Sequence, residues 1–268
     1  MKKFAVLIIL IASIVTAAQT KRTSPASEAE LAQITERGKK LADYDVAAWY
    51  GTDAVMALNP TEGSVERYIA KRSGDGWNVA FGRLNEKGDK FLINYEAVQG
   101  DKPKEFKGVK LDKPKEDDGF FLFAARAIAT SLADFKGQAR PYNVAVLPAP
   151  DNQLYVYVLP AQTQNGIYPL GGDARYLISG DGLKLIEKRQ MHKSIIEFTG
   201  NDKAAGGYHT AIMDQVPEDS DVFHVLVRKP SVPEWIMTEL FVYRIEPDGK
   251  IRYLMTREAF TKKGPSGL

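Results

Sequence analysis

The chain from Phe120 to Phe135 reads FFLFAARAIATSLADF, and this stretch has the most regular helical pattern in the sequence. Its apolar side chains recur at intervals of three and four residues, at Phe121, Ala124, Ala125, Ile128, Leu132 and Phe135. Polar side chains lie on the opposite side, which is typical of a helix that covers a core with one face. The pattern therefore predicts a helix over residues 120–135 whose large apolar side chains, including Leu132, lie in the core.

Short runs that are typical of β-strands flank this helix on both sides. They lie at residues 65–71, 77–84, 91–98, 142–147, 154–159, 175–178, 183–190, 239–246 and 250–254. Turn sequences such as the SGDG segments at 73–76 and 179–182 separate many of them, and short turns join antiparallel neighbours. We therefore expect an α+β fold, in which a mostly antiparallel or mixed β-sheet carries the 120–135 helix on one face.

A capping-box pattern precedes a second helical segment near the N-terminus. The Ser27 hydroxyl can accept from the backbone N–H of Glu30, and the Glu30 side chain can reach back. One apolar stripe follows, so an amphipathic helix is expected over residues 28–42. Residues 45–58 are apolar enough to be buried, but their period leaves helix and strand both open.

Residues 101–118 differ in composition from the rest of the chain. They contain six lysines, six acidic residues and two copies of the sequence DKPKE, at 101–105 and 112–116. Because these charges cancel and few apolar residues interrupt them, the segment is expected to be a solvated loop or linker. The predicted division is a signal peptide (1–18), an N-terminal helix with a meander (19–100), this charged loop (101–118), an α+β domain (119–256) and a tail (257–268).

The N-terminus indicates export from the cytoplasm. Met1-Lys2-Lys3 precedes an apolar run from Phe4 to Ala18 that ends in small residues. A basic start, an apolar stretch too short to span a membrane comfortably and a small-residue exit are typical of a secretory signal peptide. We expect a periplasmic or secreted protein that begins near Gln19, without membrane contact once the signal is cleaved; an uncleaved anchor is the alternative.

Composition excludes two kinds of function. The chain has 36 basic and 34 acidic residues, so it carries equal numbers of each once Lys2 and Lys3 are removed. A nucleic-acid partner would require an uncompensated basic face, so none is expected. The chain has no cysteine, which excludes disulfides, thiol chemistry and a lipid anchor on cysteine.

The three histidines are the strongest candidates for chemistry. The common signatures of serine hydrolases, phosphate loops, zinc metalloproteases and dinucleotide-binding domains are missing from the sequence. His192, His209 and His224 nevertheless lie within one segment, and neutral imidazole is a good zinc ligand. Three imidazoles on neighbouring elements could converge on one ion; the alternative is that each is a half-buried structural histidine.

The segment from His209 to Asp221 resembles the signature of the JAMM (MPN-type) metallopeptidases, which reads His-x-His, a loop, and Pro-Ser-x-x-Asp at the start of a helix. His209 matches the first histidine, and Pro217 with Asp221 keeps the spacing of proline to aspartate. In that family two imidazoles and the aspartate hold zinc, and a glutamate on an earlier strand activates the water. The resemblance implies that His209 and Asp221 bind zinc, with His192 or His224 completing the set, and that zinc-bound water attacks a peptide or isopeptide bond.

The segment departs from this signature at two positions. Ala211 stands where the second histidine belongs and Glu218 where the serine belongs, and no earlier glutamate is assigned as the base. Loss of one ligand should abolish a tight zinc site unless another histidine replaces it. The sequence therefore favours a non-catalytic exported domain without a cofactor, which binds a protein, a wall component or a small ligand. A zinc-dependent JAMM-like hydrolase is the alternative.

Overall fold

The computed structural model describes residues 22–199 and 203–263, and its fold is α+β, as the sequence predicts. Within these residues the strands form four sheets, nearly all with antiparallel pairing. The expected signal peptide, residues 1–18, lies outside the described residues. Among the described helices, none is both long enough and apolar enough to cross a membrane.

The first sheet is an antiparallel meander in the order β1-β2-β3-β4. Its strands are β1 (Arg67–Ser73), β2 (Gly76–Leu84), β3 (Phe91–Gln99) and β4 (Phe106–Asp117). The prediction of a loop over residues 101–118 is wrong for most of its length, because β4 pairs with β3 from Gln99↔Phe106 to Phe91↔Asp117. Its lysines lie on an exposed edge strand, where charge discourages pairing with other chains.

The second sheet has the order β5-β6-β8-β9, again antiparallel. Its strands are β5 (Tyr142–Pro148), β6 (Leu154–Pro160), β8 (Ala174–Ile178) and β9 (Leu185–Gln190), with a short 3₁₀ turn at Pro150–Asn152.

Helix α2 (Phe120–Asp134) packs between the first two sheets and confirms the predicted helix. Phe121 and Ile128 are buried there, and Phe135 packs against the same core. The prediction that Leu132 is buried is wrong, since 39% of it is exposed. The helix is rotated so that Ser131 faces inward instead, and the Ser131 hydroxyl donates to the carbonyl of Ala127 at 2.8 Å.

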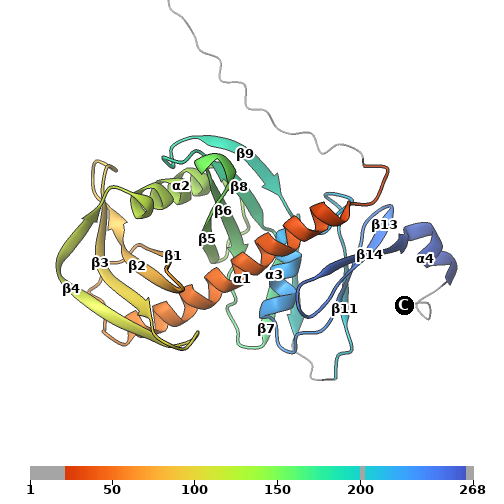
Figure 1. Ribbon diagram of the computed structural model, residues 1–268, viewed down its shortest axis with the longest axis horizontal. Coiled ribbons are helices and arrows are strands. Elements are labelled where there is room, and N and C mark those ends of the chain that lie inside the picture. The colour runs from red at the N-terminus through yellow and green to blue at the C-terminus, as the bar shows by residue number, and fades with distance from the viewer. Residues whose placement is uncertain (1–21, 200–202, 264–268) are drawn as a thin grey trace, which may run out of the picture.

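Helix α1 (Glu28–Met56) continues well past the predicted end at residue 42, so the ambiguous segment 45–58 is largely helical. Its N-terminus is capped as expected, because the Ser27 hydroxyl accepts from the N–H of Glu30 at 3.2 Å. Early residues such as Ile34 lie in a core with the C-terminal sheet, and later residues such as Val55 lie in a core with the first two sheets. Figure 1 shows α1 running diagonally across the molecule and linking these regions.

The C-terminal part contains a two-stranded sheet and a four-stranded sheet. The first pairs β7 (Ile167–Gly171) with β10 (Ile195–Thr199), and the second has the order β11 (Gly207–Thr210), β12 (Glu234–Met237), β13 (Phe241–Ile245), β14 (Ile251–Thr256). Strand β11 is parallel to β12, so this sheet is mixed.

Two helices complete this part, α3 (Asp219–Val227) and α4 (Arg257–Lys263). The expected tail over residues 257–268 is therefore helical where it is described. Helix α3 lies against α1, and the two cross closely at Gly38. A Cβ built on Gly38 would lie 2.5 Å from Cβ of Val222, so any larger residue there would push the helices apart. This contact fixes the position of α3, which carries Asp221.

Candidate metal centre

Three of the four residues proposed as ligands converge on one buried point. His192 lies just after β9, His209 lies in β11, and Asp221 lies in the first turn of α3. One ligand atom from each residue lies within 4.8 Å of the other two. The Nε2 atoms of His192 and His209 are 3.1 and 3.0 Å from the same oxygen, Oδ1 of Asp221.

These three atoms have no hydrogen-bond partner although they are buried. Nε2 of His192, Nε2 of His209 and Oδ1 of Asp221 are close together, but their directions do not give hydrogen bonds. Buried polar groups are almost always partnered, so three unpartnered atoms at one point require an explanation. In a tetrahedral zinc site with bonds of about 2.0–2.2 Å, ligand atoms lie about 3.3 Å or slightly more apart, close to the N–O separations here.

A carboxylate contacts the Nδ1 atom of each imidazole. Nδ1 of His192 lies 2.9 Å from Oδ1 of Asp173, and Nδ1 of His209 lies 3.0 Å from Oε1 of Glu234. Glu234 is itself held by Nη1 of Arg228 at 2.6 Å. A carboxylate on Nδ1 fixes the ring so that Nε2 is free for an ion, an arrangement that recurs at histidine-ligated metal sites.

The local backbone orients Asp221 in the same way. Its Oδ2 accepts from the backbone N–H of Glu218 at 2.7 Å, and together these residues form a capping box at the start of α3. This leaves Oδ1 for the two imidazoles. The Glu218 that replaces the serine of the JAMM signature also binds Arg189, whose Nε donates to Oε2 at 2.8 Å.

A glycine with a left-handed backbone places His192. Gly171 has φ of 93°, and a Cβ built there would lie 2.2 Å from the carbonyl oxygen of Ser194 and 3.1 Å from Cβ of His192. A side chain at Gly171 would therefore displace the segment that carries His192. The next residues along the chain lead to Asp173, which binds the His192 ring.

Charge within the cluster shifts all three pKa values. Burial disfavours the charged imidazole, but the carboxylates of Asp173 and Asp221 outweigh this and raise the pKa of His192 well above its ordinary value. For His209 burial again lowers the pKa, and Asp221 and Glu234 reverse the effect and raise it to about 9. Burial alone would raise the pKa of Asp221, but the two imidazoles hold it far below its ordinary value. Without a metal, a carboxylate thus lies between two protonated rings.

His224, the fourth proposed ligand, lies outside the group of three. Its ring packs against Phe198, with ring centroids 4.8 Å apart, and makes no hydrogen bond to any residue the structure describes. Burial, and then the neighbouring Arg228 guanidinium, lower its pKa to about 3. Of the two histidines, His192 rather than His224 lies with His209 and Asp221.

A small cavity of about 60 Å³ adjoins the two imidazoles. His192, His209, Lys193, Ser194 and Thr210 are among the residues that line it. Since a water molecule occupies about 30 Å³ in the liquid, the cavity has room for one or two waters beside the ligand atoms. Among the described residues, no aspartate or glutamate lines it.

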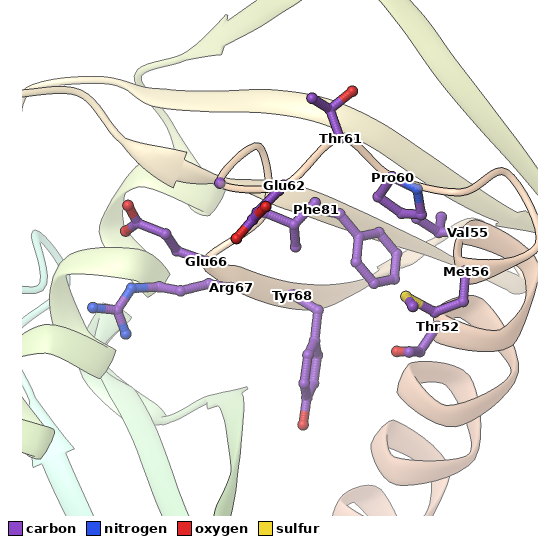
Figure 2. A pocket seen from close by; sticks show the side chains of 12 residues that line it. Thr52, Val55, Met56, Pro60, Thr61, Glu62, Glu66, Arg67, Tyr68 and Phe81 are labelled. Carbon is purple, nitrogen blue, oxygen red and sulfur yellow. The ribbon is translucent and has the colours of Figure 1, made fainter.

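A second hollow of about 310 Å³ lies far from this centre, between the C-terminal end of α1 and β1 (Figure 2). Met56 and Phe81 form one end, and Glu66 and Arg67 lie at the other. No histidine lines it. It offers no cluster of catalytic side chains comparable to the three ligand atoms.

Sequence reasoning identified His192, His209 and Asp221 but missed the residues that hold them. Asp173, Glu234 and Arg228 are not among the residues that the sequence nominates. Asp173 and Glu234 lie 19 and 25 positions from the histidines they contact, so no local spacing signals the pairing.

No protein-family model, no curated protein and no solved structure matches the chain. The likeness to JAMM metallopeptidases therefore rests on the residues themselves, and the chemistry of the centre must be argued from its geometry.

Proposed function

We propose that this protein binds one zinc ion through His192, His209 and Asp221 and uses it as a metal-dependent hydrolase. The observation that carries the proposal is the convergence of three buried ligand atoms that lack hydrogen-bond partners, together with the carboxylates that fix both imidazoles. Two histidines and one carboxylate are a ligand set typical of catalytic zinc, which keeps its fourth position for water.

The small cavity supports a catalytic rather than a purely structural ion. Structural zinc sites are usually closed by four protein ligands, whereas here the described residues supply three and the cavity adjoins the imidazoles. Bound zinc lowers the pKa of its water to about 7 and so supplies a nucleophile at neutral pH. By resemblance to the JAMM family, the substrate is a peptide or isopeptide bond.

One observation favours a second candidate, a non-catalytic domain that binds zinc or another ligand. Among the residues that the structure describes, no carboxylate lines the cavity, so none of them is placed there as a general base. The JAMM signature requires a glutamate for that role. The hydroxyl residues Ser194 and Thr210 line the cavity instead.

Metal analysis tests the shared part of both candidates. The protein without residues 1–18 is purified, stripped with a chelator, reloaded with zinc and analysed for bound metal. We expect one zinc per chain, and loss of tight binding in His192→Ala, His209→Ala and Asp221→Ala. His224→Ala is the matched control, because it removes a buried histidine of α3 that lies outside the group, and it should retain zinc. Retention of zinc by all four variants would overturn the site.

Hydrolysis separates the two candidates. The zinc-loaded protein is incubated with fluorogenic peptides and with isopeptide-linked substrates, and Asp221→Asn provides the background. Turnover that disappears in the variant and in the chelator supports the hydrolase. Stoichiometric zinc without turnover on either substrate class would favour the non-catalytic domain.

A further inference from the structure

A groove of about 680 Å³ is lined by residues of both α1 and α3 and has the size typical of small-ligand sites. Ala42, Asp45, Val46 and Trp49 line it from α1, at the three- and four-residue spacing that puts side chains on one helical face. Residues of α3 line the opposite side, and the ends of β6 and β7 add to the wall. No residue of this groove lines the cavity beside the metal centre, so the two sites are separate.

An exposed indole dominates one wall. Trp49 is 57% exposed, although it lies in the middle of a long helix whose other large side chains are mostly buried. Tyr50 and Tyr168 also line the groove. Exposed aromatic faces in a concave site cost hydrophobic free energy unless a ligand covers them, and they offer flat surfaces for stacking.

Asp45 has no partner among the residues that the structure describes. It is half-buried, makes no hydrogen bond or ion pair with any of them, and burial raises its pKa to about 6. The amide side chains of Asn143 and Asn165 are exposed and line the same groove. Together the carboxylate and the two amides offer acceptors and donors to a ligand that can hydrogen-bond.

We propose that this groove binds a saccharide. A sugar ring has an apolar face that stacks on an indole, and hydroxyls that donate to a carboxylate and both donate to and accept from an amide. Trp49, Asp45 and the two amides present those three chemistries within one groove. This site goes beyond the proposed zinc chemistry and does not depend on it.

Other classes of ligand fit the groove less well. An apolar ligand would cover Asp45 and the two amides without hydrogen-bonding to them. A cation would lie near three lysines that line the groove, at positions 39, 104 and 229, and an anion would lie near Asp43 and Asp45. A hydroxylated ring satisfies the polar groups without either penalty.

The test uses the full protein without residues 1–18 on an array of neutral and acidic oligosaccharides. Bound sugars are then titrated in solution by tryptophan fluorescence and calorimetry. We expect at least a tenfold loss of affinity in Trp49→Ala and a smaller loss in Asp45→Asn, with Trp49→Phe retaining part of the binding. Tyr208→Ala is the matched control, because Tyr208 is an exposed aromatic residue outside the groove, and its affinity should match that of wild type.

Circular dichroism confirms that each variant is folded, and each titration is repeated in zinc and in chelator. Binding should be equal in both, so a failure of the zinc site leaves this result unaffected. Absence of binding to every saccharide on the array, or affinity that is unchanged in folded Trp49→Ala, would overturn the proposal.

Discussion

Asp219 and Asp221 lie two residues apart at the start of α3, and both are about 1% exposed, yet their surroundings differ completely. Asp219 is surrounded by donors. Nε of Arg37 lies 2.9 and 3.0 Å from its two oxygens, the hydroxyl of Tyr157 donates at 2.9 Å, and Arg175 forms an ion pair with it. Asp221 lies on the opposite face of the helix. Its Oδ2 accepts from the backbone N–H of Glu218, and its Oδ1 lies between two imidazoles without a hydrogen-bond partner.

The difference distinguishes two uses of a buried carboxylate. Asp219 is satisfied entirely by the protein, and its partners on α1, β6 and β8 hold α3 in place. Asp221 is held in orientation but left incomplete, which is typical of a group that completes its coordination with a ligand. Burial of a carboxylate alone therefore does not indicate a ligand site. A buried carboxylate oxygen without a hydrogen-bond partner does.

The largest loss of stability should come from removing the charge of Asp219, the carboxylate whose partners are all in the protein. Asp219→Asn leaves Arg37 and Arg175 without their buried counter-charge, so it should lower the free energy of unfolding by about 3–5 kcal/mol. Asp221→Asn should cost clearly less when a chelator is present, because its imidazoles can lose their protons. Urea unfolding of both variants in chelator measures the difference, and equal losses would contradict the distinction.

Zinc should stabilise the folded protein only through the site that contains Asp221. At a free zinc concentration of about 100 times Kd, binding to the folded state alone should add about 2.7 kcal/mol to the free energy of unfolding. Thermal melts in zinc and in chelator compare wild type with His209→Ala, which should show no zinc-dependent rise. Glu36→Gln, an exposed control on α1, should respond as wild type does. A rise of equal size in His209→Ala would show that zinc binds elsewhere.

The carboxylates behind the imidazoles should tune zinc affinity without touching the ion. Glu234→Gln keeps the size of the side chain but removes the charge that faces His209, so zinc affinity should fall by about 10- to 100-fold. Competition with a fluorescent chelator measures the change. An affinity within twofold of wild type would mean that Glu234 merely packs against the ring.

The pH dependence of stability should have opposite slopes with and without zinc. The pKa of His209 is raised to about 9 in the folded state, whereas it is about 6.5 in the unfolded state. The stability that the protonated ring contributes is therefore fully present below pH 6.5 and is lost as pH rises through 9. In chelator, stability should therefore fall between pH 6.5 and 9, by about 3 kcal/mol. In zinc it should rise over the same interval, since only neutral imidazoles bind the ion. Parallel slopes in urea titrations would contradict the site.

Local patterns predicted much of the fold. Helix α2 and the meander were correctly expected because their apolar spacing and turn residues are continuous in sequence. Strand β4 was missed because it is an edge strand with mostly exposed, charged residues, so no alternating apolar face marks it. The second half of α1 was ambiguous because it buries small residues such as Ala47 and Gly51, which contribute little to a hydrophobic pattern.

The ligand atoms of the site could be predicted, but their arrangement could not. Residue type nominated His192, His209 and His224, and the resemblance to the JAMM signature nominated Asp221. Choosing between His192 and His224 depends on where β9 ends relative to α3, which is set by tertiary packing. The exposure of Leu132 has the same cause, since neighbouring sheets determine how far α2 is rotated.

Helix α1 also determines how the protein unfolds. Its first turns belong to the core of the C-terminal sheet, and its later turns belong to the core shared by the two N-terminal sheets. Neither region can therefore lose its structure while the other keeps a complete core, because both would have to give up the same helix. Unfolding should occur in a single cooperative step, and a fragment that starts after residue 56 should not hold a stable tertiary structure.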